Sequence, residues 1–151
     1  MSEFDNKTVV VTGAAGALGQ AVANIFHTSG ARVIGVDVIP FEAAYEMRQA
    51  DLIDPEGAAQ VVESVGAIDI LANIAGGFTM GDSVADTSDE TWDFMFNLNT
   101  RTVLNMARAV VPRMVERKSG KIINIGARAG LRGSASMAAY AASKSVVIRL
   151  T

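Results

Sequence analysis

The sequence predicts an α/β protein built on a doubly wound parallel sheet. Short apolar runs rich in β-branched residues alternate with longer stretches of helical periodicity along all 151 residues, which is typical of this class. Half of the residues are apolar and 19% are charged, a composition that suits a buried sheet. The length is sufficient for one domain with a substantial core, so we expect residues 1–151 to form a single domain.

The bulk composition also narrows the function. A net charge of −3 gives no electrostatic reason to expect a nucleic acid or an anionic membrane as a partner. The sequence contains neither a secretory signal nor an apolar run long enough to cross a bilayer. It has no cysteine, which excludes disulfides and thiolate zinc sites, and we expect no metal site. The absence of cysteine fits a reducing cytoplasm, which is the location we expect.

The first predicted unit is a strand, a glycine-rich turn and a helix. Residues 7–12 contain three consecutive valines, which indicate a buried strand, and residues 16–29 have a helical pattern that Gly30 ends. The expected inward face of this helix consists of four apolar residues, Leu18, Val22, Ile25 and Phe26.

Three glycines, Gly13, Gly16 and Gly19, lie in and after this turn. Gly13 allows a tight reversal, Gly16 has no Cβ to hold a ligand away, and Gly19 allows the helix to pack closely on its strand. A strand, turn and helix of this kind bind the pyrophosphate of a dinucleotide at the helix N-terminus. A tight turn without a ligand is the alternative. No Gly-Lys-Ser/Thr follows, which argues against a nucleoside triphosphate site.

The second predicted strand, residues 31–36, ends at Asp37. This carboxylate stands eighteen residues after Gly19, close to the spacing of an acid that binds the ribose hydroxyls of the adenosine. An anion here would repel a 2′-phosphate, so the sequence favours NAD(H) over NADP(H). The alternative is an aspartate that caps a helix or a turn.

The middle of the sequence continues the alternation. Residues 40–49 leave room for only a shortened helix, and residues 47–52 supply a third strand that ends at Asp51. Residues 55–65 are predicted as a helix with proline in its first turn, and residues 67–73 as a fourth apolar strand.

A glycine-containing loop over residues 78–86 is a candidate for mobile substrate contacts. Residues 87–90 fit a capping box, and the helix that follows is expected to bury Trp92, Met95 and Phe96. Residues 97–118 are predicted as one long helix that Pro112 kinks or ends.

The last predicted strand covers residues 121–125, and after a loop over residues 126–136 a final helix begins at residue 137. This helix carries Tyr140 and Lys144, which lie on one face because they are four residues apart. A lysine ammonium beside a phenol lowers the pKa of the phenol, which suits proton transfer to or from a substrate oxygen. A surface pair without chemistry is the alternative.

Five motifs in this order resemble those of the short-chain dehydrogenases/reductases, over essentially the whole chain. They are Thr12-Gly13-x-x-Gly16-x-x-Gly19, Asp51-Leu52, Asn73-Ile74-Ala75-Gly76, Asn97-Leu98-Asn99 and Tyr140-Ala-Ala-Ser143-Lys144. The resemblance implies a Rossmann fold and an NAD(H)-dependent oxidoreductase. Its reaction would transfer hydride between the nicotinamide and a small carbonyl, alcohol or C=N substrate.

The resemblance also implies roles for single residues. Tyr140 matches the catalytic acid/base, Lys144 its partner, and Asn99 the asparagine that holds a proton-relay water. The implied cofactor contacts are Gly13, Ala15, Gly16, Leu18, Gly19, Asp37, Asp51, Leu52, Asn73, Ala75, Gly76, Tyr140 and Lys144. Family members pair through helices that correspond to the long helix and the last helix, so a homodimer or homotetramer is expected.

Three positions depart from the family pattern. Ala17 replaces the middle glycine, Ile74 replaces a second asparagine, and Ala127 stands where the catalytic serine belongs, thirteen residues before Tyr140. An alanine cannot hydrogen-bond a substrate carbonyl or a developing oxyanion. The surrounding segment, from Gly126 onward, is similar to that of dihydropteridine reductases, which also lack this serine.

Family members continue with two more strands and a substrate-covering loop, so we expect the fold of this sequence to be incomplete at its C-terminal side. The missing serine and the missing segment leave an alternative function open. The protein would then be a nicotinamide-binding module or redox sensor with little or no turnover.

Overall fold

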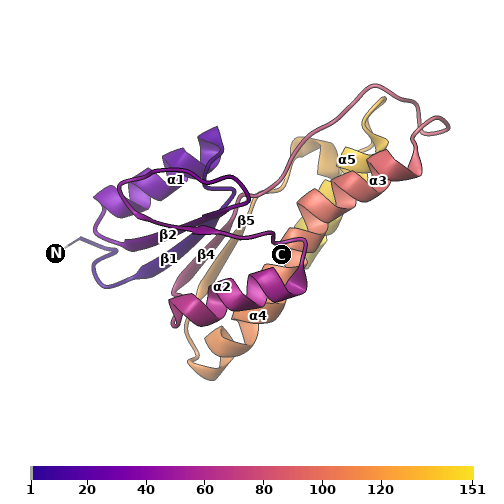
Figure 1. The fold of residues 1–151 in the computed structure, drawn as a ribbon. Coiled ribbons are helices and arrows are strands. Elements are labelled where there is room, and N and C mark those ends of the chain that lie inside the picture. The colour runs from indigo at the N-terminus through magenta and orange to yellow at the C-terminus, as the bar shows by residue number, and fades with distance from the viewer. Residues whose placement is uncertain (1) are drawn as a thin grey trace.

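A five-stranded parallel sheet forms the centre of the computed structural model, which describes residues 2–151 (Figure 1). The strands are ordered β3-β2-β1-β4-β5, and each pairs in parallel with its neighbours. Their bounds are Thr8–Thr12 for β1, Arg32–Asp37 for β2, Glu46–Gln49 for β3, Ile70–Asn73 for β4 and Lys121–Asn124 for β5. The doubly wound parallel sheet predicted from the sequence is therefore confirmed.

Residues 2–151 form five α-helices: α1 (Ala17–Thr28), α2 (Pro55–Val65), α3 (Asp89–Phe96), α4 (Thr102–Glu116) and α5 (Ala138–Leu150). Helix α1 lies on one side of the sheet and α2 and α4 lie on the other, while α3 and α5 pack together at the right in Figure 1. A π-helical turn over Asn97–Arg101 joins α3 to α4, and a short 3-10 turn covers Arg128–Leu131. Within residues 2–151, no helix is both long and apolar enough to span a bilayer.

The valines of β1 form the middle of the core. Val10 aligns with Ile34 of β2 and Leu71 of β4, and all three are fully buried with residues of α2 and α4. Val9 and Val11 point to the opposite face and are fully buried beside α1. Because both faces are covered, the strand has no need for the alternation of apolar and polar residues seen in half-exposed strands.

The segment between β2 and β3 differs from the expectation. Residues 40–45 form no helix, and β3 occupies Glu46–Gln49 rather than residues 47–52. The cause is a close contact at Gly35 of β2, where a Cβ would overlap the Met47 sulfur and lie 3.0 Å from the ring of Tyr45. This packing fixes the third strand earlier in the chain than its apolar pattern suggests.

The buried face of α1 was predicted only in part, because Val22 and Phe26 pack against the core as expected. Leu18 and Ile25 are 51% and 63% exposed, whereas Gly19 and Ala23 are buried. Gly19 packs directly on the carbonyl of Gly13. This contact places the small residues of the helix closest to the turn, and Val22 and Phe26 pack against the core beside them.

Two further expectations, both in the second half of the chain, are corrected. Trp92 is 41% exposed and stacks on Phe96 with ring centroids 4.8 Å apart, so it lies outside the core, although Met95 is fully buried as predicted. The N-cap of α3 is Ser88, whose hydroxyl accepts a hydrogen bond from Thr91 N at 3.1 Å. The expected box at residues 87–90 is thus shifted by one position.

Pro112 does not end α4, which continues to Glu116. The proline is exposed on the side of the helix that faces away from the sheet. The irregular part of the predicted long helix lies instead at its start, in the π-helical turn.

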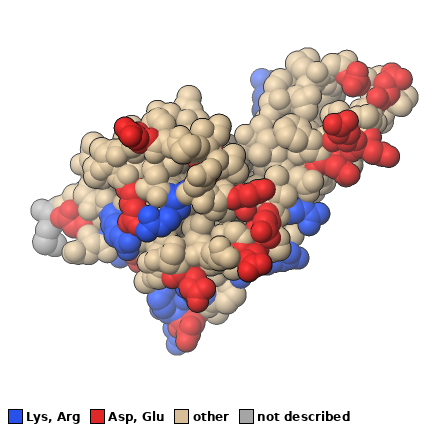
Figure 2. All heavy atoms as spheres, in the orientation of Figure 1, with Lys and Arg blue, Asp and Glu red and all other residues tan. Residues whose placement is uncertain are grey.

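Charged side chains are unevenly distributed over the face drawn in Figure 2. Acidic residues gather around the start of α3, where Asp89 and Glu90 occupy the first turn. Over the sheet, basic and acidic side chains are mixed, as in the ion pairs of Glu46 with Arg32 and Arg48. The described residues of this face therefore form no extended basic surface.

Candidate functional site

The glycine turn after β1 is shaped by two of its three glycines. Gly13 has a positive φ of 65°, and a Cβ there would lie 2.8 Å from the backbone N and Cα of Ala75. A Cβ on Gly19 would overlap the carbonyl oxygen of Gly13 and lie 2.8 Å from Ala14 Cα. Neither distance is compatible with a side chain, so the packing of the chain itself requires glycine at both positions.

Gly16 is different. Its backbone is extended (φ −75°, ψ 160°), and an added Cβ would meet only the carbonyl oxygen of Gly13, at an ordinary 3.4 Å. Gly16 is also the N-cap of α1 and provides no side chain to cap the helix, so the first N–H groups of α1 remain available to an anion. The missing Cβ leaves space outside the chain, which fits the approach of a pyrophosphate.

A buried hydroxyl connects the glycine turn to β4. Thr12 Oγ1 accepts hydrogen bonds from the backbone N–H groups of Ile74 and Ala75, both at 3.0 Å, and Thr12 is 1% exposed. The sequence identified Thr12 only as part of a motif and gave no sign of these two bonds. They hold residues 74–76 against the turn, where the predicted cofactor segment begins.

Asp37 at the end of β2 reaches across to the glycine turn. One carboxylate oxygen accepts from Ala15 N at 2.9 Å, and the other accepts from Ile39 N at 3.1 Å. The turn-capping interpretation of Asp37 is therefore present in the structure. Each oxygen keeps a free lone pair, so the same carboxylate can still accept from ribose hydroxyls.

The backbone after β3 accepts hydrogen bonds from an asparagine that the sequence analysis did not identify. Asn105 of α4 donates to the carbonyl oxygens of Leu52 (3.0 Å) and Ile53 (2.9 Å), and it is 3% exposed. Leu52 is buried and Asp51 is exposed beside it. A buried polar residue on an otherwise apolar helix face was the only signal for this support.

Two asparagines predicted as site residues, Asn73 and Asn99, are buried and do not line the cavity of the site. Asn99 is fully buried; its side chain accepts from Gly77 N at 2.9 Å and donates to Gly77 O and Ser143 Oγ at 3.1 Å. Asn73 is 3% exposed and donates to Asn124 Oδ1 at 2.8 Å. Both side chains therefore fix backbone and neighbouring side chains in the site.

Lys144 is buried at the base of the site. Its ammonium donates to the carbonyl oxygen of Ile125 at 2.8 Å, and the residue is 6% exposed. This burial lowers the pKa of Lys144 below its usual range, because desolvation penalises the charged form. A Cβ on Gly76 would lie 3.3 Å from the Lys144 ammonium and 2.8 Å from Asn99 Oδ1, so the glycine allows the two groups to converge.

Tyr140 lies one turn before Lys144 on α5 and packs against Phe78, the first residue of the loop that the sequence marked for substrate contacts. The rings of Tyr140 and Phe78 meet edge to face, with centroids 4.8 Å apart and planes at 85°. Ala127, at the position of the family's serine, is the extended residue that starts the 3-10 turn before α5. Its methyl group donates no hydrogen bond.

One cavity of about 740 Å³ connects these parts. It extends from the glycine turn past Asp37 and the end of β3 to α5. Twelve of the predicted site residues line it: Gly13, Ala15, Gly16, Leu18, Gly19, Asp37, Asp51, Leu52, Ala75, Gly76, Tyr140 and Lys144. The cavity lies at the carboxyl ends of the strands, where ligands bind in open parallel sheets.

A family model described as short chain dehydrogenase matches residues 7–151. The chain belongs to the short-chain dehydrogenase family. It is 37% identical to the short-chain dehydrogenase/reductase olcF of Penicillium canescens, over 100% of this chain and 63% of that protein. It is 33% identical to dehydrogenase/reductase SDR family member 6 of Rattus norvegicus, over 100% of this chain and 64% of that protein.

Solved structures give the same result for this family member. The ligand-free aldohexose dehydrogenase of Thermoplasma acidophilum superposes with a TM-score of 0.90 at 27% identity, over 99% of this chain and 60% of that one. The chain thus spans about three fifths of the length of these relatives. Membership of the family agrees with the Rossmann-like parallel sheet of this chain.

Proposed function

We propose that the protein is an NAD(H)-dependent oxidoreductase that interconverts a small carbonyl, or a related C=N group, and its reduced form. The observation that carries this proposal is the single cavity that joins the glycine turn to Tyr140 and Lys144. A pyrophosphate at the turn and a substrate at α5 would both be in contact with the same extended space. A turn without a ligand, or a surface Tyr-Lys pair, gives no reason for such a connection.

The chain's own residues would divide the work as follows. The first turn of α1 binds the pyrophosphate, and the exposed Gly16 leaves it room. The nicotinamide, when bound, supplies or accepts hydride at its C4 atom. Tyr140 passes a proton to or from the substrate oxygen, and the ammonium of Lys144, one helical turn away, is held by Ile125 O. Asn99 positions this region through Gly77.

Asp37 supports the preference for NAD(H). Its carboxylate lines the cavity beside the glycine turn, where the adenosine ribose of a dinucleotide is expected. A 2′-phosphate at this place would be repelled by the negative charge. We expect NADPH to bind more weakly than NADH.

The test is a fluorescence titration of the full-length protein with NADH and NADPH. NADH consumption is then followed with a panel of ketones, quinones and quinonoid pterins. We expect tighter binding of NADH and turnover of at least one carbonyl class. The Tyr140→Phe variant keeps the ring and removes the hydroxyl, so it should bind NADH normally and lose turnover. Survival of the rate in this variant would contradict the role of the phenol.

A second candidate function is favoured by Ala127. Where an oxyanion donor is used, its loss typically costs about 2.7–4 kcal/mol of transition-state stabilisation, and the Ala127 methyl cannot donate. The protein would then bind a nicotinamide nucleotide with little turnover and act as a sensor of redox state. NADH binding by the full-length protein without consumption by any substrate of the panel would favour this candidate.

The remaining proposals concern partners and location. We expect a small-molecule substrate, no nucleic acid or membrane partner, a cytoplasmic location, and a homodimer or homotetramer formed through α4 and α5. On α4, Val111 and Val115 are 39% and 68% exposed, which supports a covered face in an oligomer. The native mass of the full-length protein tests both its length and its assembly.

A further inference from the structure

Phe78 occupies an unusual position beside Tyr140. Its ring meets the Tyr140 ring edge to face with centroids 4.8 Å apart, yet Phe78 is 54% exposed. Both side chains line the 740 Å³ cavity. Contact with the Tyr140 ring therefore covers less than half of Phe78, and the rest of its surface is open. The exposed part of Phe78 is therefore available to a molecule in the cavity.

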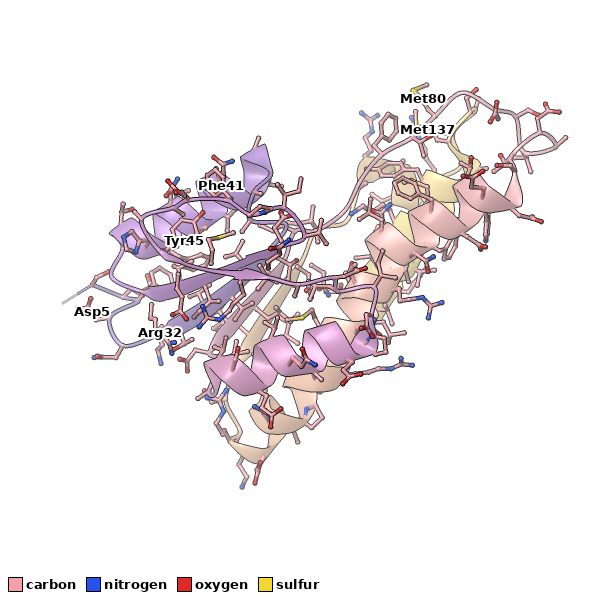
Figure 3. The ribbon with its side chains drawn as sticks, viewed as in Figure 1. Asp5, Arg32, Phe41, Tyr45, Met80 and Met137 are labelled. Carbon is pink, nitrogen blue, oxygen red and sulfur yellow. The ribbon has the colours of Figure 1, made fainter. Side chains whose placement is uncertain are left out.

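The backbone on both sides of Phe78 is fixed. Gly77 forms two hydrogen bonds with the Asn99 amide, through its N–H at 2.9 Å and its carbonyl at 3.1 Å. Further along the same loop, Gly81 N donates to Ser136 O at 3.0 Å. Figure 3 shows Met80 and Met137 next to each other at this connection between the two loops. Phe78 is thus held in place by a supported segment.

The polar side of the site is sparse by comparison. Ala127 donates no hydrogen bond at the position where the family has a serine. Tyr140 of α5 lines the cavity and has a hydroxyl that can donate to a substrate oxygen. Discrimination among carbonyl compounds then depends more on the apolar surface next to the phenol. Phe78 is the aromatic part of that surface in direct contact with Tyr140.

We propose that Phe78 and Tyr140 form an aromatic corner that selects planar, conjugated carbonyl compounds as substrates. A planar ring stacks on the exposed part of Phe78. Because the two side-chain rings are perpendicular, a carbonyl in the plane of the stacked ring can direct its lone pairs toward the phenol. A saturated ring of the same size buries similar area but cannot stack. This inference rests on the proposed carbonyl reduction and specifies its substrate class.

The experiment compares acetophenone with cyclohexyl methyl ketone, two ketones that differ only in whether the ring is planar and conjugated. The measured quantity is the ratio of their kcat/KM values with the full-length protein and NADH. Stacked aromatic pairs contribute enough free energy for a roughly two- to tenfold effect. Phe78→Leu should therefore lower the ratio by about two- to tenfold, and Phe78→Tyr should keep it.

Phe94→Leu is the matched control. Phe94 is also 54% exposed and lines the same cavity, but its ring has no contact with that of Tyr140 among the described aromatic pairs. The ratio should remain at the wild-type value in this variant. An equal loss for both ketones in Phe78→Leu would assign Phe78 to supporting Tyr140 alone and overturn the proposal, as would an unchanged ratio.

Binding of the two ketones to the complex with NAD⁺ provides a readout that needs no turnover. Saturation-transfer NMR should show stronger acetophenone contact in the wild type, and this preference should disappear in Phe78→Leu. If the ratio or the binding preference is insensitive to Phe78 while ketones are reduced, the corner is wrong and the proposed function stands. If neither ketone is reduced but the preference depends on Phe78, the corner stands and the proposed reaction is wrong for these ketones.

Discussion

Substitution by alanine should lower the thermal stability at one glycine of the turn and the affinity for NADH at another. Gly16 and Gly19 lie three residues apart at the start of α1, and both belong to the motif that predicts dinucleotide binding. The geometry separates them, because the packing of the chain requires glycine at position 19, whereas at position 16 only the proposed pyrophosphate would require it. Alanine at each position separates the two.

The expected cost of Gly19→Ala follows from its neighbours. The new Cβ would overlap the carbonyl oxygen of Gly13, with the carbonyl carbon at 2.7 Å and Ala14 Cα at 2.8 Å. All are backbone atoms, so α1 must move away from the turn, and overpacking of this kind costs about 1–3 kcal/mol or more. For a domain of this size each kcal/mol lowers Tm by about 2–4 °C. We expect a decrease of about 2–12 °C.

Gly16→Ala should leave the free energy of unfolding nearly unchanged. Its extended backbone suits alanine, and the nearest atom to the new Cβ is 3.4 Å away. Reduced freedom of the unfolded chain adds about 0.4–1 kcal/mol of stability, and a poorer N-cap removes a similar amount. The net change should stay within about 1 kcal/mol. The methyl group would nevertheless lie where the pyrophosphate approaches, so NADH should bind at least about tenfold more weakly, or about 1.4 kcal/mol.

Thermal unfolding without ligand, followed by NADH titration, measures both quantities in each variant. Wild-type affinity for NADH in Gly16→Ala would show that no ligand approaches this glycine, and the proposed cofactor position would be wrong. Wild-type stability in Gly19→Ala would contradict the close packing of α1 on the turn.

Two other predictions concern stability. Thr12→Val leaves the N–H groups of Ile74 and Ala75 without their acceptor. Each unsatisfied group costs about 1–3 kcal/mol, and water can reach the half-buried Ile74 and Ala75 and reduce this cost. Urea unfolding should therefore show a free energy of unfolding lower by about 2–4 kcal/mol. Thr12→Ser, which keeps the hydroxyl, should recover most of it, and equal losses in both variants would argue against the two bonds. Burial lowers the pKa of Lys144 in the folded protein, so the unfolded chain binds more protons between that lowered pKa and about 10.4, and Lys144 should add stability as pH rises through this window. As the pH rises from 7 to 10, the Tm of the wild type should increase relative to that of Lys144→Met. A difference in Tm that stays constant with pH would contradict the lowered pKa of Lys144.

The parts of the fold that follow from local chemistry were predicted correctly. Three consecutive valines fix β1, and Pro55 and Gly66 mark the ends of α2. Such signals act within a few residues and need no knowledge of the rest of the chain. The parallel sheet was also predicted correctly, because strands that alternate with helices have few ways to connect.

The errors arose where one distant contact overrides the local pattern. The missing helix at residues 40–45 depends on Gly35, where the absent side chain admits Met47 and Tyr45. The burial of α1 depends on Gly19 and the carbonyl of Gly13. In both cases a glycine determines which neighbouring side chains are covered, and the sequence predicted a close-packing role only for Gly19.

The site itself shows why its residues could be proposed from the sequence but not their supports. Residues proposed to face a ligand carry distinctive chemistry, as do Asp37, Tyr140 and Lys144, which line the cavity. Their supports, Thr12 and Asn105 among them, are ordinary polar residues that become informative only through partners 52 to 63 residues away.

Asn99 combines both kinds of information. The motif named it, but the continuous helical pattern of residues 97–118 placed it on a regular helix. The structure instead has a π-helical turn over Asn97–Arg101, with Asn99 fully buried at its centre. The wider turn is a local departure from the regular i→i+4 pattern, of the kind often found at functional sites. There the Asn99 amide pairs with both backbone groups of Gly77, 22 residues earlier. Because Gly77 directly precedes Phe78, the same irregular turn that buries Asn99 also sets the aromatic surface beside Tyr140. A substitution that restores a regular helix at this point should therefore disturb substrate selection before it disturbs the sheet.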